Sequence, residues 1–176
     1  AIALDLLDLR YAYSAQSKPG SGDFLDEARR LLKKDPDRMA LATTHWWYTR
    51  SVGLSSEVCK AHLDTAMAIY KAIGDSSGIA RCLSVAVYFP PVINDPEQAL
   101  ANRMEAIRLY EGQGNLLGQE WELNNLGVSH VMQANYPEGL ACFLKALEIS
   151  KRMGDTDMEV TCLGNIAEVY LALDDR

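Results

Sequence analysis

A 40-residue repeat is the feature of this sequence that most limits the folds open to it. Gly74-Asp75, Gly114-Asn115 and Gly154-Asp155 recur at intervals of 40 residues. Alanines and large apolar residues keep the same register: Ala61, Ala101 and Ala141; Ala66, Ala106 and Ala146; and Met67, Ile107 and Leu147. Self-similarity at this period indicates stacked supersecondary units, each of which buries its apolar face against its neighbours.

Each unit is expected to consist of two helices. Within residues 119–155, apolar residues recur at spacings of three and four, first over 121–130 and then over 140–153. Pro137 suits the first turn of the second helix, and Gly154 is expected to end that helix in the left-handed conformation. Because no segment alternates strictly between apolar and polar residues, we expect no strands and an all-α fold.

Two helix boundaries are predicted from local sequence. Thr156 and Glu159 fit a capping box, with Thr156 as the N-cap, and Asp95-Pro96 is a comparable helix start. Pro90-Pro91 is expected to end a helix near Phe89 and to leave residues 90–94 as an extended loop. This loop would either present Phe89 and Val92 to a partner or be a tolerated variation of the repeat.

The units resemble tetratricopeptide repeats, in which a Leu/Gly pair on helix A faces small and aromatic residues on helix B. The matching residues of the third unit are Leu123, Leu126, Gly127, His130, Tyr136, Gly139, Phe143, Ala146 and Leu147. The usual Tyr and Ala are replaced by His130 and Gly139. The resemblance implies a right-handed superhelix of stacked antiparallel helical hairpins, forming a single array over residues 1–176. The approximate units are 1–35, 36–75, 76–115, 116–155 and a partial 156–176.

The 40-residue length is similar to variants found in large bacterial signalling and transcriptional regulators. The chain begins with Ala1 rather than Met, and we expect it to be a fragment of such a regulator. Arrays of this kind bind proteins or peptides on the concave surface lined by helices A. The resemblance places these residues there: Thr44, Tyr48, Ser51, Arg81, Ser84, Tyr88, Trp121, Asn124, Asn125, Val128, Asn165 and Glu168.

Aromatic and amide groups in this set suit an extended peptide, since amides bind its backbone and rings contact its side chains. Tyr48, Tyr88 and Trp121 could instead pack between helices. Asn125 and Asn165, one period apart, could instead form a hydrogen bond between repeats. The Lys/Arg partners that some chaperone-binding tetratricopeptide domains use to hold a C-terminal carboxylate are missing, so we do not expect that specificity.

Composition excludes several other classes. A hydrophobic fraction of 48% with a net charge of −7 excludes a disordered tail, and the acidic balance argues against direct nucleic-acid binding. No stretch is long enough for a membrane span and no signal peptide is visible, so we expect a cytoplasmic protein without a membrane partner. The net charge lies entirely in residues 81–176. These acidic residues form either a surface for a basic partner or helix faces that only contact solvent.

No catalytic residue, cofactor or metal site is expected. The four cysteines and three histidines form no metal-binding spacing, and isolated cysteines among apolar residues are usually buried hydrophobes. Gly112, Gly114 and Gly118 are not preceded by a strand, as a dinucleotide-binding loop requires. We therefore expect a non-catalytic scaffold or effector-sensing domain. The alternatives are self-association, as a homodimer joined through terminal hairpins, and a small-molecule sensor.

Overall fold

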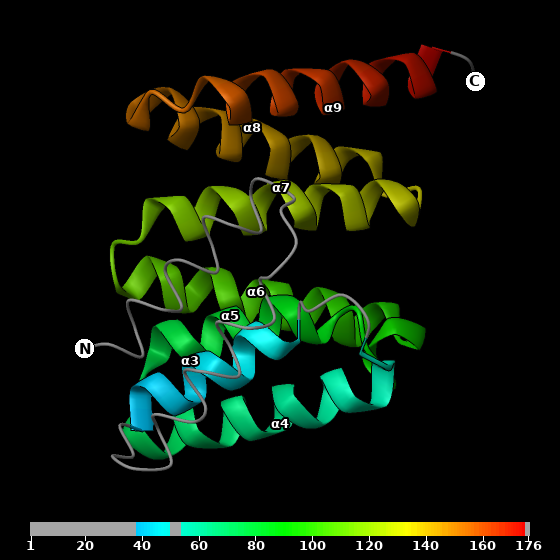
Figure 1. The fold of residues 1–176 in the computed structure, drawn as a ribbon. Helices are drawn as coiled ribbons and strands as arrows, with labels where there is room; N and C mark the ends of the chain where they lie inside the picture. The colour runs from blue at the N-terminus through cyan, green and yellow to red at the C-terminus, as the bar shows by residue number, and fades with distance from the viewer. Residues whose placement is uncertain (1–37, 50–53, 175–176) are drawn as a thin grey trace. The chain divides into compact units, whose positions relative to one another are not determined.

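The structure, a computed structural model, describes residues 38–49 and 54–174 (Figure 1). Within these ranges the chain forms seven α-helices and one short 3-10 helix, and no strand, which confirms the all-α prediction. The elements are α3 (Arg38–Tyr48), α4 (Ser56–Ile73), α5 (Ser76–Ala86), η1 (Val92–Asn94), α6 (Pro96–Gly112), α7 (Leu116–Met132), α8 (Tyr136–Met153) and α9 (Thr156–Asp174).

The chain divides into two compact units, residues 1–90 and 91–176. In the described part of the first unit, α4 packs against both α3 and α5. In the second unit, α6, α7, α8 and α9 each pack against the next helix along the chain. Short turns join α4 to α5 and each packed pair of the second unit, so these helices form helical hairpins. A single array over residues 1–176 stays a prediction. The first of its predicted repeats, residues 1–35, lies outside the described residues.

The repeated Gly-Asp/Asn dipeptide ends one helix and begins the next. Gly74 and Gly154 are the C-caps of α4 and α8, each with φ 73°, and Gly114, two residues beyond the end of α6, has φ 65°. Glycine adopts this left-handed conformation without the steric penalty of a Cβ atom. The residue that follows then accepts a backbone N–H of the next helix: Asp75 from Ser77, Asn115 from Gly118 and Asp155 from Met158.

This arrangement corrects one predicted boundary. Asp155, rather than Thr156, accepts the Met158 N–H at 3.0 Å, and Thr156 is the first residue of α9. The physical reason is the turn at Gly154, which brings the Asp155 carboxylate to the exposed amides of the first helical turn. The other predicted start is confirmed, because Asp95 caps α6 through the Gln98 N–H and Pro96 lies in the first turn.

The segment around Pro90-Pro91 also differs from the prediction. The helix α5 ends at Ala86, before both prolines as expected, but residues 90–94 are not extended. Pro91 has φ −79° and ψ −14°, which is a helical conformation, and Val92–Asn94 continue as the 3-10 helix η1. Phe89 is not presented to a partner, because its ring is buried in the core of the first unit.

Both units have a core of buried apolar side chains. That of the first unit comprises Ala42, Cys59, Leu63, Ala66, Tyr70, Cys82, Val85 and Phe89. That of the second comprises Ile107, Leu123, Leu126, Ala146, Leu147, Ile149, Met158 and Cys162. All four cysteines are free, and three of them are buried. Burial raises the pKa of Cys82 to about 12, so this thiol acts as a small hydrophobe, as expected.

Pairs of one large and one small residue recur where helix B meets the following helix A. Tyr70 lies against Gly78, and 40 residues later Tyr110 lies against Gly118. A Cβ atom on either glycine would lie 2.2 Å or 2.6 Å from the tyrosine ring, so no side chain fits there. Forty residues further on, the small residue stands on helix B and the large one on the following helix A: they are Ser150 and Met158, and both are buried.

Candidate functional site

The predicted site residues fall into both units. The first unit contains Thr44, Tyr48, Arg81, Ser84 and Tyr88, and the second contains Trp121, Asn124, Asn125, Val128, Asn165 and Glu168. Ser51 lies outside the described residues. Each group is therefore considered within its own unit.

Arg81 is held inside the first unit by two aromatic rings. Its guanidinium carbon lies 5.2 Å from the Trp46 ring centroid and 5.4 Å from that of Tyr70. Its Nη2 donates to the Tyr70 hydroxyl at 3.2 Å, and its backbone carbonyl accepts the Trp46 indole N–H at 3.3 Å. Cation–π and hydrogen-bonding contacts of this kind join α3, α4 and α5. The Arg81 side chain therefore stabilises the fold of this unit.

The hydroxyls of this unit are also largely engaged. Thr44 is buried and donates to the Ala40 carbonyl at 2.8 Å, and Ser84 donates to the Ala80 carbonyl at 3.0 Å. Tyr48 stacks on His62, with ring centroids 4.5 Å apart. Tyr88, 58% exposed, is the most accessible of the predicted residues in this unit.

In the second unit, side chains of α7 and α9 form an accessible surface. Trp121 is 57% exposed, Val128 is partly exposed and Asn125 is half-buried; their spacing places them on one face of α7. Asn165 and Glu168 lie one turn apart on α9. We call Trp121, Asn125, Val128, Asn165 and Glu168 the α7–α9 surface. It combines an indole ring, two amides, an apolar side chain and a carboxylate.

A hydrogen bond between asparagines joins the two helices of this surface. Asn165 Nδ2 donates to Asn124 Oδ1 at 2.8 Å, and Asn124 is buried. A bond between repeats is therefore present, but it joins Asn165 to Asn124 rather than to Asn125. The Asn124 oxygen is also 3.9 Å from the Cys162 thiol. Asn125, the next residue of α7, does not take part in this hydrogen bond.

The helix α7 also carries two buried acidic residues. Glu122 accepts a hydrogen bond from Arg103 Nη1 of α6 at 3.1 Å, and both side chains are buried. The repeat-equivalent residues of Arg103 are Leu63 and Phe143, and those of Glu122 are Cys82 and Cys162. An ion pair thus replaces an apolar contact at one junction between repeats. The second buried acid, Glu120, has no such partner.

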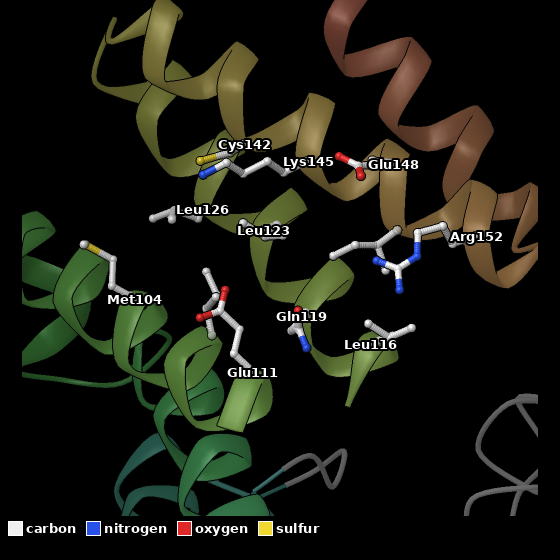
Figure 2. A pocket seen from close by; sticks show the side chains of 12 residues that line it. Met104, Glu111, Leu116, Gln119, Leu123, Leu126, Cys142, Lys145, Glu148 and Arg152 are labelled. Carbon is white, nitrogen blue, oxygen red and sulfur yellow. The ribbon is translucent and has the colours of Figure 1, made fainter. Parts of the chain in front are cut away.

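A pocket of about 430 Å³ lies among α6, α7 and α8 (Figure 2). Ile107, Leu123, Leu126 and Ile149 form its buried apolar lining. Charged side chains surround it: Glu111, Lys145, Glu148 and Arg152. Figure 2 shows Lys145 extending toward Cys142 at one end, with Arg152 at the other. The volume suits a small ligand. No predicted site residue lines this pocket, because the prediction considered only the helix-A surface.

Residues 38–49 and 54–174 contain no group of three or more His, Cys, Asp or Glu side chains arranged to hold a metal ion. No helix in these ranges is long and apolar enough to cross a membrane.

Comparison with known proteins identifies a related fold. No family model matches the sequence, and no curated protein matches it. Among solved structures, the chain is similar to a Signal Transduction ATPase with Numerous Domains from Pyrococcus horikoshii that carries a tetratricopeptide repeat sensor. The TM-score is 0.73 at 16% identity, over 96% of this chain. The chain matches 26% of the length of that protein. This similarity supports a tetratricopeptide-like helical repeat fold.

Proposed function

We propose that the chain is a non-catalytic sensor or protein-interaction domain of a larger cytoplasmic regulator, and that its α7–α9 surface binds an extended peptide. The exposed indole of Trp121 carries the proposal. An exposed tryptophan on a helix face that also carries an amide and an apolar side chain has the composition of an interaction hot spot. The sensor role of the repeat domain in the similar archaeal ATPase supports the same reading.

The neighbours of Trp121 indicate the chemistry of the peptide. Asn125 offers an amide to the peptide backbone, and exposed Glu168 favours a basic side chain. Val128 and the indole would contact an apolar side chain. We therefore expect a peptide in which a basic residue lies close to an aromatic or aliphatic one.

Trp121→Ala is expected to weaken peptide binding at least tenfold, because truncating a hot-spot residue commonly removes 2 kcal/mol or more of binding free energy, on the order of 30-fold. Because Trp121 is largely exposed, the melting temperature should change little. The probes are peptides selected from a displayed library of random 12-residue sequences, measured by isothermal titration calorimetry. Leu144→Ala, a similarly exposed apolar residue on α8, is the control. Equal binding by wild type and Trp121→Ala would reject this surface.

The pocket among α6, α7 and α8 favours a second candidate, a small-molecule effector site. Its apolar lining suits an amphipathic organic molecule. Two cations, Lys145 and Arg152, and two acids, Glu111 and Glu148, surround it, so a zwitterion fits better than an anion. We expect such a metabolite to raise the melting temperature of the wild type, and Cys142→Trp, which would fill the pocket, to remove that rise. A thermal-shift screen of a metabolite panel without any response would argue against this candidate.

A further inference from the structure

Glu120 is a buried carboxyl group at a position that is apolar in the neighbouring repeats. Its side chain is 0% exposed, and the equivalent residues 40 positions away are Ala80 and Val160. Neither carboxylate oxygen makes a well-formed hydrogen bond among the described residues, although the Ser150 hydroxyl and the Asp155 carboxyl group are near enough to affect its pKa. Buried polar groups are normally paired, since an unpaired one loses its hydration without compensation. The position therefore calls for a physical explanation.

The groups that act on Glu120 come from α8, from the α8–α9 turn and from α9. They are the Ser150 hydroxyl, the Asp155 carboxylate and the Cys162 thiol. Two of them already have other partners, because Ser150 donates to the Ala146 carbonyl at 2.8 Å and Asp155 accepts the Met158 N–H. No cation is among the groups that shift the pKa of Glu120. An ionised Glu120 would thus lie near a second carboxylate without a counterion.

The repeat explains how the carboxyl group fits at this place. Tyr70 and Tyr110 fill the positions equivalent to Ser150, so the small serine leaves room in the second unit. Glu120 is the larger residue near that serine, and Met158 begins the buried face of α9; one repeat earlier these two positions are Ala80 and Gly118. The same exchange of sizes that keeps this junction filled therefore introduces a titratable group into it.

Protonation of this group is linked to stability. Burial, and to a smaller extent Asp155, raises the pKa of Glu120 above its usual 4.5 in the folded chain. The folded state then binds a proton more tightly than the unfolded state does. Stability should therefore be greatest below about pH 4.5 for this group, fall as pH rises to the folded pKa, and stay at the lower level above it.

We propose that the protonation state of Glu120 controls how firmly the first turns of α9 pack on α7 and α8. When Glu120 is neutral, it stays buried near Asp155 and Cys162. When it is ionised, its charge opposes the Asp155 carboxylate that caps α9, and water must enter to solvate it. Opening of this helix start would also disturb the Asn124–Asn165 hydrogen bond. The inference does not depend on the proposed peptide ligand.

Glu120→Gln is expected to remove this proton dependence, because the amide cannot ionise. The unfolding equilibrium constant of the wild type should rise relative to the variant by up to tenfold for each pH unit between 4.5 and the folded pKa. Chemical denaturation from pH 4 to 8 measures this difference. Hydrogen exchange of the α9 amides, corrected for intrinsic rates, should speed up with pH in the wild type and less in Glu120→Gln.

Two further variants and one titration make the result specific. Glu148→Gln, an exposed acid on α8, should keep the wild-type pH profile, whereas Asp155→Asn should reduce the dependence while retaining a capping oxygen. The side-chain carboxyl carbon of Glu120, followed by carbon-13 nuclear magnetic resonance, should titrate above pH 4.5. A midpoint at or below 4.5, or equal pH profiles for wild type and Glu120→Gln, would overturn the proposal.

Discussion

Glu122→Ala is expected to lower the free energy of unfolding of the second unit by about 3–5 kcal/mol, since it leaves Arg103 buried without its carboxylate. The Arg103–Glu122 pair joins α6 to α7 at 3.1 Å, and both side chains are buried. Desolvation of the guanidinium is then no longer offset by the attraction of its partner. Arg103→Leu should have a loss of similar size, because it removes the cation that the buried Glu122 carboxylate faces.

The double variant Arg103→Leu/Glu122→Cys should recover most of this loss. It installs the residues that stand at these two positions in the first unit, Leu63 and Cys82, which belong to one apolar cluster. Replacement of a whole buried ion pair by apolar residues is often neutral, or stabilising by about 1–4 kcal/mol. A double variant as unstable as either single variant would show that the apolar contact is not transferable between junctions.

The measurement must report on the second unit, because the chain has two compact units and a chain of this kind need not unfold in a single transition. Trp121 is the tryptophan of the second unit, whereas Trp46 and Trp47 lie in the first. In a Trp46→Phe/Trp47→Phe background, the fluorescence of Trp121 during urea denaturation follows the second unit. The exposed pair Glu105–Arg108 on α6 is the control in the same unit, and breaking it should change stability much less than breaking the buried pair does.

Much of the helical architecture follows from local sequence. The glycines at positions 74, 114 and 154 end helices because a positive φ is needed there, and that requirement is visible in the chain. Pro137 in the first turn of α8 is also as predicted. The capping error at Thr156 is small and has a local cause: both Asp155 and Thr156 are good N-caps, and the turn geometry decides between them.

The side-chain partners could not be obtained in the same way. Arg103 stands at a large apolar position, but its pairing with Glu122 depends on how α6 and α7 pack. Arg81 matches a groove position by spacing, yet its guanidinium lies against Trp46 and Tyr70. A repeat motif specifies which face of a helix a residue occupies. It does not specify which polar groups meet across that face.

The pocket among α6, α7 and α8 could not be predicted from the repeat pattern either. Its lining residues Ile107, Leu123 and Leu126 are ordinary core positions of the motif. The pocket depends on how α6, α7 and α8 pack together, which the repeat pattern does not specify. Similarly, the repeat pattern drew attention to Asn125 and Asn165, but Asn165 forms its hydrogen bond with Asn124.

Tyr110→Ser is expected to lower the free energy of unfolding of the second unit by about 3–5 kcal/mol, as truncations of buried aromatic residues do. The ring is buried against Gly118, so its removal leaves a cavity beside a residue without a side chain. Gly118→Met alone should also destabilise, by about 1–3 kcal/mol or more, because a Cβ atom there would lie 2.6 Å from the ring.

The two changes combined should compensate each other, because Ser150 and Met158 already occupy the equivalent positions one repeat later. Tyr110→Ser/Gly118→Met is therefore expected to be more stable than the sum of the single losses predicts, with a coupling of about 0.5–3 kcal/mol. Urea denaturation of the four members of this double-mutant cycle, followed through Trp121, measures the coupling. Losses that simply add would show that the exchange at Ser150 and Met158 cannot be transferred to Tyr110 and Gly118.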